Sequence, residues 1–381
     1  MSIDDAINYQ DLRALAKKRL PKIAFDFIEG GADDEIGLDR NQQAFRNIAL
    51  VPRYMRNIDG CDRKTELFGR TYDSPFGISP TGLAGLFRPG ADLMLAEAAR
   101  AANIPFVMSG SATCTVEELA KVAPEQGWYQ LYAARDDNIS GDLINRAEVA
   151  GLSTLALTVD VPVHSNRERN FRNGFMRPLK LSWSTKLDTL NYPGWLAGYL
   201  THGMPMLANW KQYAGEGASA DDVANLVASQ VTAPLNWDNV ARYRDMWPRN
   251  LVIKGIMHPD DAVRAAELGC DGIVVSNHGA RQLDRAPGAI EALPGIVDAV
   301  GDRMTVMLDS GVQRGSDIVT ALCLGAKFVF VGRATLYGVA AGAVPGAAKA
   351  IDILRKEFDL IMGQIGAPDL SHLGPDYIFK P

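Results

Sequence analysis

Eight short apolar runs, most of them separated by segments with helical periodicity, constrain the fold of this 381-residue chain more than any other feature. The runs lie at 76–79, 106–109, 128–132, 154–160, 251–254, 272–277, 305–309 and 328–332. A helical period of apolar residues is clearest at 93–102, 260–269 and 315–322. Because strands that alternate with helices form parallel sheets, eight such units predict an α/β fold of the (β/α)8 TIM barrel type.

Two helices are predicted ahead of the barrel. Residues 12–20 have helical periodicity, and Asn8 or Asp11 can cap them by accepting a hydrogen bond from the first turn. Pro21 favours a second helix at 22–29, since its fixed φ suits the start of a helix. We therefore expect an N-terminal helical cap before the first barrel strand.

One gap between predicted strands is much longer than a barrel unit needs. Asp160 and Leu251 are far apart in the chain, so we expect an insertion at about 165–235, after the fourth strand. A doubly wound sheet is the alternative fold, but no G-x-G-x-x-G motif follows the first apolar run. We therefore expect residues 1–381 to form a single domain.

Composition excludes several classes of protein. A net charge of −6 at pH 7 lacks the basic excess that a nucleic-acid-binding face needs. Four scattered cysteines, without a C-x-x-C pair, predict a reduced compartment and no metal site. The acidic start has no apolar secretory signal, and no window reaches the roughly 18 apolar residues of a membrane-spanning helix. We expect a cytoplasmic location.

Polar side chains follow the predicted strands at their carboxyl ends. They are Thr81, Ser109, Gln130, Tyr132, Thr158, Asp160, Lys254, His278, Arg281, Asp309 and Arg333. Because barrel enzymes build their active sites at this end, we expect these groups to converge on one mouth. A barrel with a purely structural role has no need for such a set, so the pattern predicts an enzyme.

His278 and Arg281 carry the clearest chemical signal. An imidazole accepts a proton near neutral pH, and a guanidinium binds a carboxylate through two parallel hydrogen bonds. Asp160 is expected to orient His278 and to stabilise its charged form. These residues suit the removal of a proton from a small acid. The alternative interpretation is a strand end with a solvated histidine and arginine.

Two other features leave alternatives open. The glycine-containing turns at 309–315 and 332–333 each carry a cation, which favours phosphate binding over plain turns. Lys254 ends a buried strand and suits either a fixed cation beside a cofactor or a Schiff-base nucleophile, as in an aldolase. The side chains suited to hydrogen-bond the edge of a planar ring are Ser109, Gln130 and Thr158.

Short motifs recur in a fixed order along nearly the whole chain. They are Leu-Pro-Lys at 20–22, Gly-Ala-Asp-Asp-Glu at 31–35, Pro-Thr-Gly at 80–82, Trp-Tyr-Gln-Leu-Tyr at 128–132, Leu-Thr-Val-Asp at 157–160, Ser-Asn-His-Gly at 276–279 and Val-Gly-Arg at 331–333. In this order they resemble the FMN-dependent 2-hydroxy acid oxidases and dehydrogenases, and most closely the mandelate dehydrogenase branch. Single motifs are moderately specific, whereas the ordered set is very specific.

The resemblance implies roles for individual residues. His278 would remove the substrate proton, Asp160 would support its charged form, and Tyr132 would hydrogen-bond the substrate hydroxyl. Lys254 would stabilise negative charge at the N1–C2=O edge of the reduced flavin. Hydride transfer and a carbanion mechanism both stay open. The implied carboxylate-binding residues are Arg281 and Arg167.

The same resemblance implies FMN as the cofactor and no metal. The backbone near Thr81, with neighbouring polar side chains, would hold the isoalloxazine ring, and the last two strand ends would hold the ribityl chain and phosphate. The implied cofactor-binding residues are Pro80, Thr81, Gly82, Ser109, Gln130, Thr158, Lys254, Ser276, Asp309, Gly311, Arg314, Gly332 and Arg333.

Several positions depart from the family pattern. Phe27 stands where most members have a tyrosine that assists carboxylate binding, so Arg281 would carry more of that interaction. Ala280 replaces a glycine, and Gln313 replaces an arginine of the phosphate loop, for which Arg314 is expected to compensate.

Two small residues bear on the substrate. Gly82 and Ser111 are smaller than their counterparts in glycolate oxidases, which leaves room for a bulkier substrate. We therefore expect oxidation of an L-2-hydroxy acid of the (S)-mandelate type, with L-lactate second. An oxygen-using oxidase, an FMN barrel isomerase and a flavin-binding sensor are the alternatives.

The insertion also has the composition of a membrane-interface segment. Basic residues occur at 167–186, and aromatic residues, leucines and methionines follow, so residues 186–211 are expected to lie on a membrane surface. The alternative is a lid over the site or a contact with a neighbouring subunit. Attachment to the inner face of the cell membrane would let a quinone accept the electrons, and a homotetramer is usual for the relatives.

Overall fold

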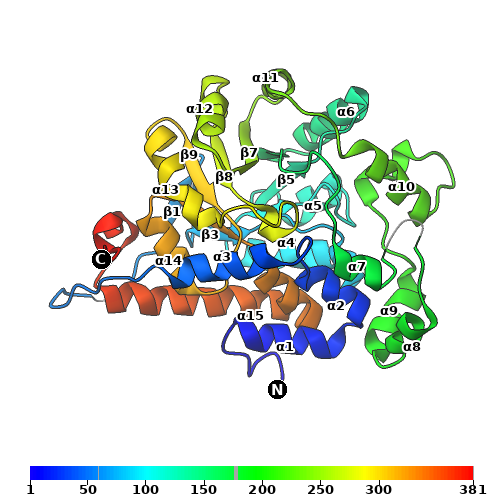
Figure 1. Cartoon of the computed structure of the whole chain (residues 1–381), viewed down its shortest axis with the longest axis horizontal. Coiled ribbons are helices and arrows are strands. Elements are labelled where there is room, and N and C mark those ends of the chain that lie inside the picture. Colours follow the sequence, from blue (N-terminus) through cyan, green and yellow to red (C-terminus); the bar gives the residue numbers. More distant parts are fainter. Residues whose placement is uncertain (59, 176–178, 381) are drawn as a thin grey trace.

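The computed structural model describes residues 1–381 except 59, 176–178 and 381, and a closed barrel of parallel strands forms its centre (Figure 1). The barrel strands are β3 (Phe76–Ile78), β4 (Phe106–Met108), β5 (Gly127–Leu131), β6 (Thr154–Thr158), β7 (Asn250–Ile256), β8 (Gly272–Val275), β9 (Thr305–Leu308) and β10 (Phe328–Val331). Neighbours follow chain order, and β10 pairs with β3 to close the ring. Each strand overlaps one predicted run, so the predicted barrel is confirmed.

Side chains fill the inside of the barrel rather than leaving a channel. Trp128, Phe328 and Phe330 are fully buried there, and the Trp128 and Phe330 ring centroids lie 5.5 Å apart. A hairpin formed by β1 (Thr65–Leu67) and β2 (Arg70–Tyr72), which the sequence analysis did not predict, joins this cluster through its aromatic residues. Because the interior is solid, a ligand must bind at the rim of the barrel.

Helices surround the strands, as expected for a barrel of this kind. They are α4 (Ala91–Ala101), α5 (Val116–Val122), α6 (Asp137–Val149), α11 (Trp237–Met246), α12 (Pro259–Glu267), α13 (Ala289–Val300), α14 (Gly315–Cys323) and α15 (Arg333–Ile365). The long α15 bends at Gly342 and Ala343, where Arg88 Nη2 donates to the Ala340 carbonyl at 3.0 Å and so satisfies a carbonyl near the bend. Short 3-10 turns lie at Ala84–Leu86, His278–Ala280, Leu370–His372 and Pro375–Tyr377.

The N-terminal cap consists of α1 (Tyr9–Arg19), α2 (Lys22–Glu29) and α3 (Ile36–Arg46). Asn8 caps α1 by accepting a hydrogen bond from the Asp11 N–H at 2.9 Å, so Asn8, and not Asp11, is the N-cap. Helix α3 packs against the His278–Ala280 turn, which places the cap at the carboxyl end of the barrel (Figure 1).

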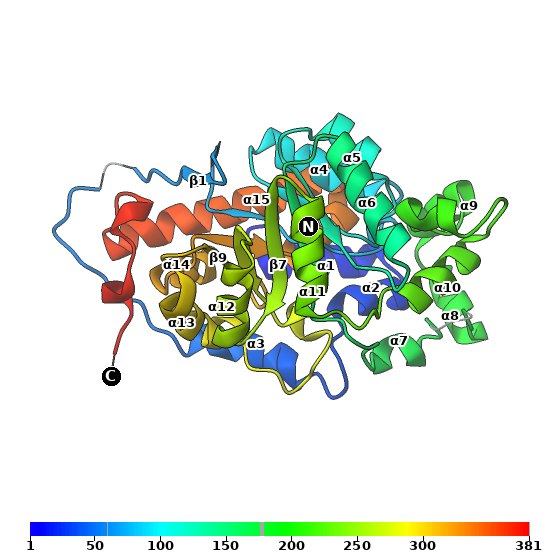
Figure 2. The same ribbon diagram turned by 90° about the horizontal axis from the view of Figure 1, so that it is seen from above.

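The predicted insertion projects from one side of the barrel (Figure 2). It contains α7 (Glu168–Arg172), α8 (Trp183–Thr189), α9 (Pro193–His202), the 3-10 segment η2 (Ala208–Tyr213) and α10 (Ala220–Gln230). Helices α8 and α9 have no buried residue. Within the described part of the chain, no helix has the length and apolarity needed to cross a membrane.

Candidate active site

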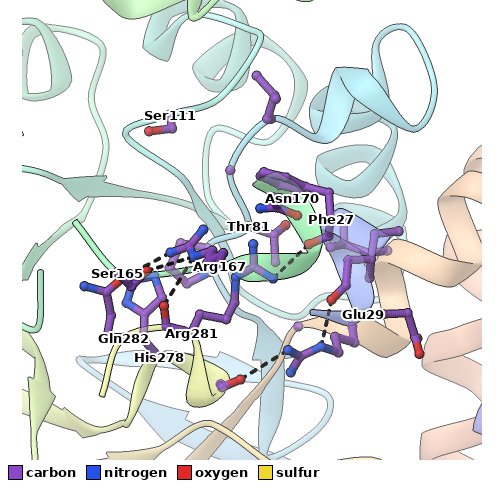
Figure 3. Close-up of a pocket in the computed structure, with 18 of the residues that line it drawn as sticks. Phe27, Glu29, Thr81, Ser111, Ser165, Arg167, Asn170, His278, Arg281 and Gln282 are labelled. Atoms are coloured by element: carbon purple, nitrogen blue, oxygen red, sulfur yellow. Dashed lines mark hydrogen bonds between the residues drawn. The ribbon is translucent and has the colours of Figure 1, made fainter. Parts of the chain in front are cut away.

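The strand ends meet around a cavity of about 1170 Å³ (Figure 3). The predicted residues that line it are Phe27, Pro80, Thr81, Gly82, Ser111, Tyr132, Arg167, Lys254, His278, Arg281, Asp309, Gly311, Gly332 and Arg333. Six predicted residues are not part of its lining. Arg314 lies apart, and the other five are buried polar groups or members of hydrogen-bonding networks nearby: Ser109, Gln130, Thr158, Asp160 and Ser276. The structure therefore gathers residues from distant parts of the sequence around one space.

His278 and Asp160 form the central pair of the site. His278 Nδ1 lies 2.8 Å from Asp160 Oδ1, and its Nε2 lies 3.4 Å from the Tyr132 hydroxyl. Burial, together with Lys254 and Arg167, lowers the pKa of His278, although Asp160 opposes this shift. The imidazole is therefore neutral at pH 7 and can accept a proton.

A left-handed turn presents this imidazole to the cavity. His278, Gly279 and Ala280 have φ values of 58°, 62° and 60°, and the left-handed region costs roughly 1–2 kcal/mol for each non-glycine residue. The turn is held by the Gly279 N–H, which donates to Ser310 Oγ at 2.9 Å, and by the Ala280 N–H, which donates to Asn277 Oδ1 at 3.1 Å. These bonds offset the strain.

Lys254 is a buried cation held in a fixed position. Its Nζ donates to Ser276 Oγ at 2.8 Å and lies 3.1 Å from Asp309 Oδ2. Burial lowers the pKa of Lys254, but Asp309 and Asp160 outweigh burial and raise it above the ordinary value. A lysine that stays protonated is a poor Schiff-base nucleophile, so the geometry favours a fixed charge.

Arg167 and Arg281 lie together at the cavity (Figure 3), and Arg333, which lines the same cavity, adds a third positive charge. Arg281 Nη1 donates to the Phe27 and Gly30 carbonyls at 2.8 Å. Burial, followed by repulsion from Arg167 and Arg333, lowers the pKa of Arg281 well below its ordinary value. No ion pair links these three guanidinium groups to a carboxylate among the described residues. The cluster is therefore suited to bind anions.

Buried polar groups without partners lie beneath the same cavity. Gln130 Oε1 accepts from Ser109 Oγ at 3.2 Å and from the Gly110 N–H at 3.0 Å. Gln130 Nε2 and Thr158 Oγ1 have no hydrogen-bond partner, although both side chains are buried. Because buried polar atoms are almost always hydrogen-bonded, these two atoms indicate a ligand with polar edges.

Arg314 lies apart from this site. It does not line the cavity, because its Nη2 forms an ion pair with Glu357 Oε1 at 3.0 Å, while the neutral Gln313 lines the cavity instead. The N-terminus of α14 is already occupied, since Asp317 accepts from the N–H groups of Gln313 and Arg314. The expected compensation by Arg314 is therefore not seen, whereas Arg333 at the start of α15 does line the cavity.

The family model described as FMN-dependent dehydrogenase matches residues 16–380. (S)-mandelate dehydrogenase of Pseudomonas putida is 40% identical over 371 residues, which cover 97% of this chain and 93% of that protein. The chain belongs to the FMN-dependent dehydrogenase family.

Other relatives of this FMN-dependent dehydrogenase differ in their named substrate. An L-lactate dehydrogenase of Stenotrophomonas maltophilia (strain R551-3) is 37% identical over 367 residues, covering 96% of this chain and 97% of that protein. The crystal structure of the monotopic membrane protein (S)-mandelate dehydrogenase has a TM-score of 0.95 at 39% identity, covering 99% of this chain and 100% of that chain. The chain is thus an FMN-dependent 2-hydroxy acid dehydrogenase whose substrate the relatives leave undecided.

The residues at the mouth of this FMN-dependent dehydrogenase fit FMN. The free Gln130 Nε2 and Thr158 Oγ1 suit the polar edge of an isoalloxazine ring. Arg333, at the first turn of α15, suits a phosphate, since helix N-termini and guanidinium groups both bind anions.

Sequence reasoning missed two aromatic residues of the site. Phe87 and Phe175 line the cavity, and both pack against Phe27, with ring centroids 6.1 Å and 5.1 Å away. Phe87 follows a 3-10 turn and Phe175 lies in the insertion, so no strand end or motif marks them. Only the three-dimensional contact reveals them.

Proposed function

We propose that this dehydrogenase oxidises an L-2-hydroxy acid of the (S)-mandelate type to the 2-oxo acid. The observation that carries the proposal is the pairing of His278 Nδ1 with Asp160 Oδ1 at 2.8 Å, in the same cavity as Arg281 and Arg167. A base beside two anion-binding groups suits a small hydroxy acid held by its carboxylate.

In this reaction Arg281 and Arg167 bind the substrate carboxylate, and the Tyr132 hydroxyl contacts the substrate hydroxyl. His278 Nε2 accepts a proton from the substrate, and Asp160 stabilises the imidazolium that results. FMN, when bound, accepts the two electrons that the substrate loses. Lys254 places a fixed positive charge beside the cofactor.

The remaining residues would position the cofactor. Pro80, Thr81 and Gly82 would contact the isoalloxazine ring through the backbone, and Gln130 and Thr158 would bind its polar edge. The residues proposed for the ribityl chain and phosphate are Asp309, Gly311, Gly332 and Arg333.

An aryl substrate is supported by the shape and lining of the cavity. Phe27, Phe87 and Phe175 form an apolar wall, and the small residues Gly82 and Ser111 line the same cavity. An ideal Cβ at Gly82 would lie 3.2 Å from Ser111 Cβ, so a larger residue would narrow the site. Lactate is the second candidate, because L-lactate dehydrogenases are among the relatives.

Attachment to a membrane surface through residues 186–211 is part of the same proposal. Leu187 on α8, Leu190 at the junction and Leu200 on α9 are 60%, 62% and 72% exposed, and Trp183 at the start of α8 is 79% exposed. Exposed apolar side chains with a nearby cation, such as Lys186 over the Trp183 ring, suit a membrane interface. A homotetramer on the inner face of the cell membrane, with a quinone as acceptor, completes the proposal.

Anaerobic reduction of the bound flavin tests the proposal. The purified holoenzyme is mixed with (S)-mandelate, L-lactate or glycolate without oxygen, and loss of the flavin absorbance is followed. We expect bleaching to be fastest with mandelate and to slow by roughly 10²-fold or more in His278→Asn, which removes the base. Absence of bleaching with every hydroxy acid would refute the proposed function.

A further inference from the structure

The cavity has an apolar wall that the proposed hydroxy acid chemistry does not use. Besides the charged residues, the insertion lines the same cavity with small and medium apolar side chains. They are Met204, Pro205, Leu207, Ala224, Val227 and Ala228, here called the α10 wall. The proposed partners of the substrate carboxylate, Arg167 and Arg281, lie on other elements, so the α10 wall is not needed to hold the carboxylate.

Helical spacing explains how α10 builds this wall. Ala224, Val227 and Ala228 are three and four residues apart and so lie on one face of the helix. Asn225 and Ser229 are exposed on the other side. His164 Nε2 lies 2.9 Å from the Ala228 carbonyl, which ties the loop after β6 to this face. The wall is therefore anchored next to the strand that leads to Asp160.

Two features of the wall suit a flat apolar ligand. Its alanine side chains leave more space than larger residues would, and Met204, Leu207 and Val227 present apolar surface to the cavity. The wall also belongs to the same insertion as the exposed apolar residues of α8 and α9. The residues proposed to contact a lipid surface and the residues of the α10 wall therefore belong to one segment of the chain.

We propose that the α10 wall receives the ring of a quinone, the electron acceptor of this enzyme. This proposal rests on the proposed function and adds where its second substrate binds. Over the whole reaction the hydroxy acid loses two electrons and two protons to become the 2-oxo acid. The quinone takes up two electrons and two protons to become the hydroquinone, so the exchange balances.

Separate measurement of the two half-reactions tests this proposal. In a stopped-flow instrument, the oxidised holoenzyme is mixed with (S)-mandelate, and the reduced holoenzyme is mixed anaerobically with a short-chain ubiquinone. Ala228→Trp fills the wall, and we expect it to lower the second-order rate constant with quinone at least tenfold while flavin reduction stays within twofold. Ser229→Trp, one residue away and exposed, is the matched control and should change neither rate.

Any other pattern of rates in Ala228→Trp would contradict the proposal. If Ala228→Trp slows mandelate and leaves the quinone rate unchanged, the wall holds the substrate side chain. If it slows both equally, the wall is a shared entrance, and if it slows neither, the quinone binds elsewhere. Ala224→Leu provides a milder variant if Ala228→Trp does not fold, as judged by its flavin content.

A binding readout keeps this test separate from that of the proposed function. An azido-quinone is photolysed with the oxidised holoenzyme, and labelled peptides are identified by mass spectrometry. We expect labelling within 204–231, reduced at least fivefold in Ala228→Trp, even if no hydroxy acid reduces the flavin. Labelling confined to peptides that contain Phe27 or Phe87 would overturn the proposal.

Discussion

Arg281 and Phe27 interact through both the side chain and the backbone of Phe27. Arg281 Cζ lies 5.1 Å from the centroid of the Phe27 ring, and Nη1 donates to the Phe27 carbonyl at 2.8 Å. A cation above an aromatic face is favourable, and the hydrogen bond fixes the direction of the guanidinium group. The contact therefore positions the proposed carboxylate-binding group beside the proposed aryl wall.

Phe27→Tyr is expected to improve substrate binding. The added hydroxyl can donate a further hydrogen bond to the bound carboxylate, and one such bond contributes about 1 kcal/mol, or roughly fivefold in affinity. We expect KM for (S)-mandelate to fall about fivefold and kcat to change less than twofold, as measured by steady-state kinetics with an acceptor dye. Phe87→Tyr, whose ring does not stack with Arg281, is the control. An unchanged or higher KM would contradict this role.

Asp160→Asn is expected to change both the rate and its dependence on pH. Burial lowers the pKa of His278 and Asp160 raises it, so removal of the carboxylate lowers this pKa further. Since His278 must be neutral to accept a proton, kcat/KM of the wild type should fall only below pH 6.5, and in the variant the fall should move to still lower pH. The maximal rate should drop roughly 10²–10⁴-fold, because the imidazolium loses its partner. A pH profile that moves to higher pH would refute this assignment.

Gln313→Arg is expected to strengthen FMN binding. Gln313 lines the cavity, so arginine there would add a second cation near Arg333 for the phosphate group. The dissociation constant of FMN, measured by quenching of flavin fluorescence on addition to the apoprotein, should fall about tenfold. Riboflavin, which lacks the phosphate, should bind the variant and the wild type alike. Arg314→Gln should leave both constants unchanged, because Arg314 lies outside the cavity.

Charge on α8 and at its C-cap, Leu190, is expected to weaken membrane attachment. Leu187→Glu combined with Leu190→Glu places two carboxylates where apolar side chains are 60% and 62% exposed. The fraction of protein that sediments with vesicles containing anionic lipid should fall at least tenfold. Leu360→Glu changes a residue on α15 that is 56% exposed and serves as the control. Equal sedimentation of both variants would contradict attachment through this segment.

The barrel and the polar strand ends could be predicted from the sequence because each rests on a local pattern. Apolar runs identified eight strands, and polar side chains at or just beyond the carboxyl end of a strand, such as Lys254 and His278, are expected at the barrel mouth. Motif order also pointed to the family, which the family model and the mandelate dehydrogenase relative confirm.

Other features depended on contacts between distant segments, which no local pattern encodes. Three such contacts join residues from separate elements. Phe175 packs against Phe27, Arg314 pairs with Glu357 outside the cavity, and α10 lines the mouth of the barrel. The sequence by itself thus determined which backbone elements form and which polar groups reach their ends, because periodicity and strand direction are properties of neighbouring residues. The tertiary structure alone decided which side chains share the cavity, because packing and charge pairing depend on how those elements meet.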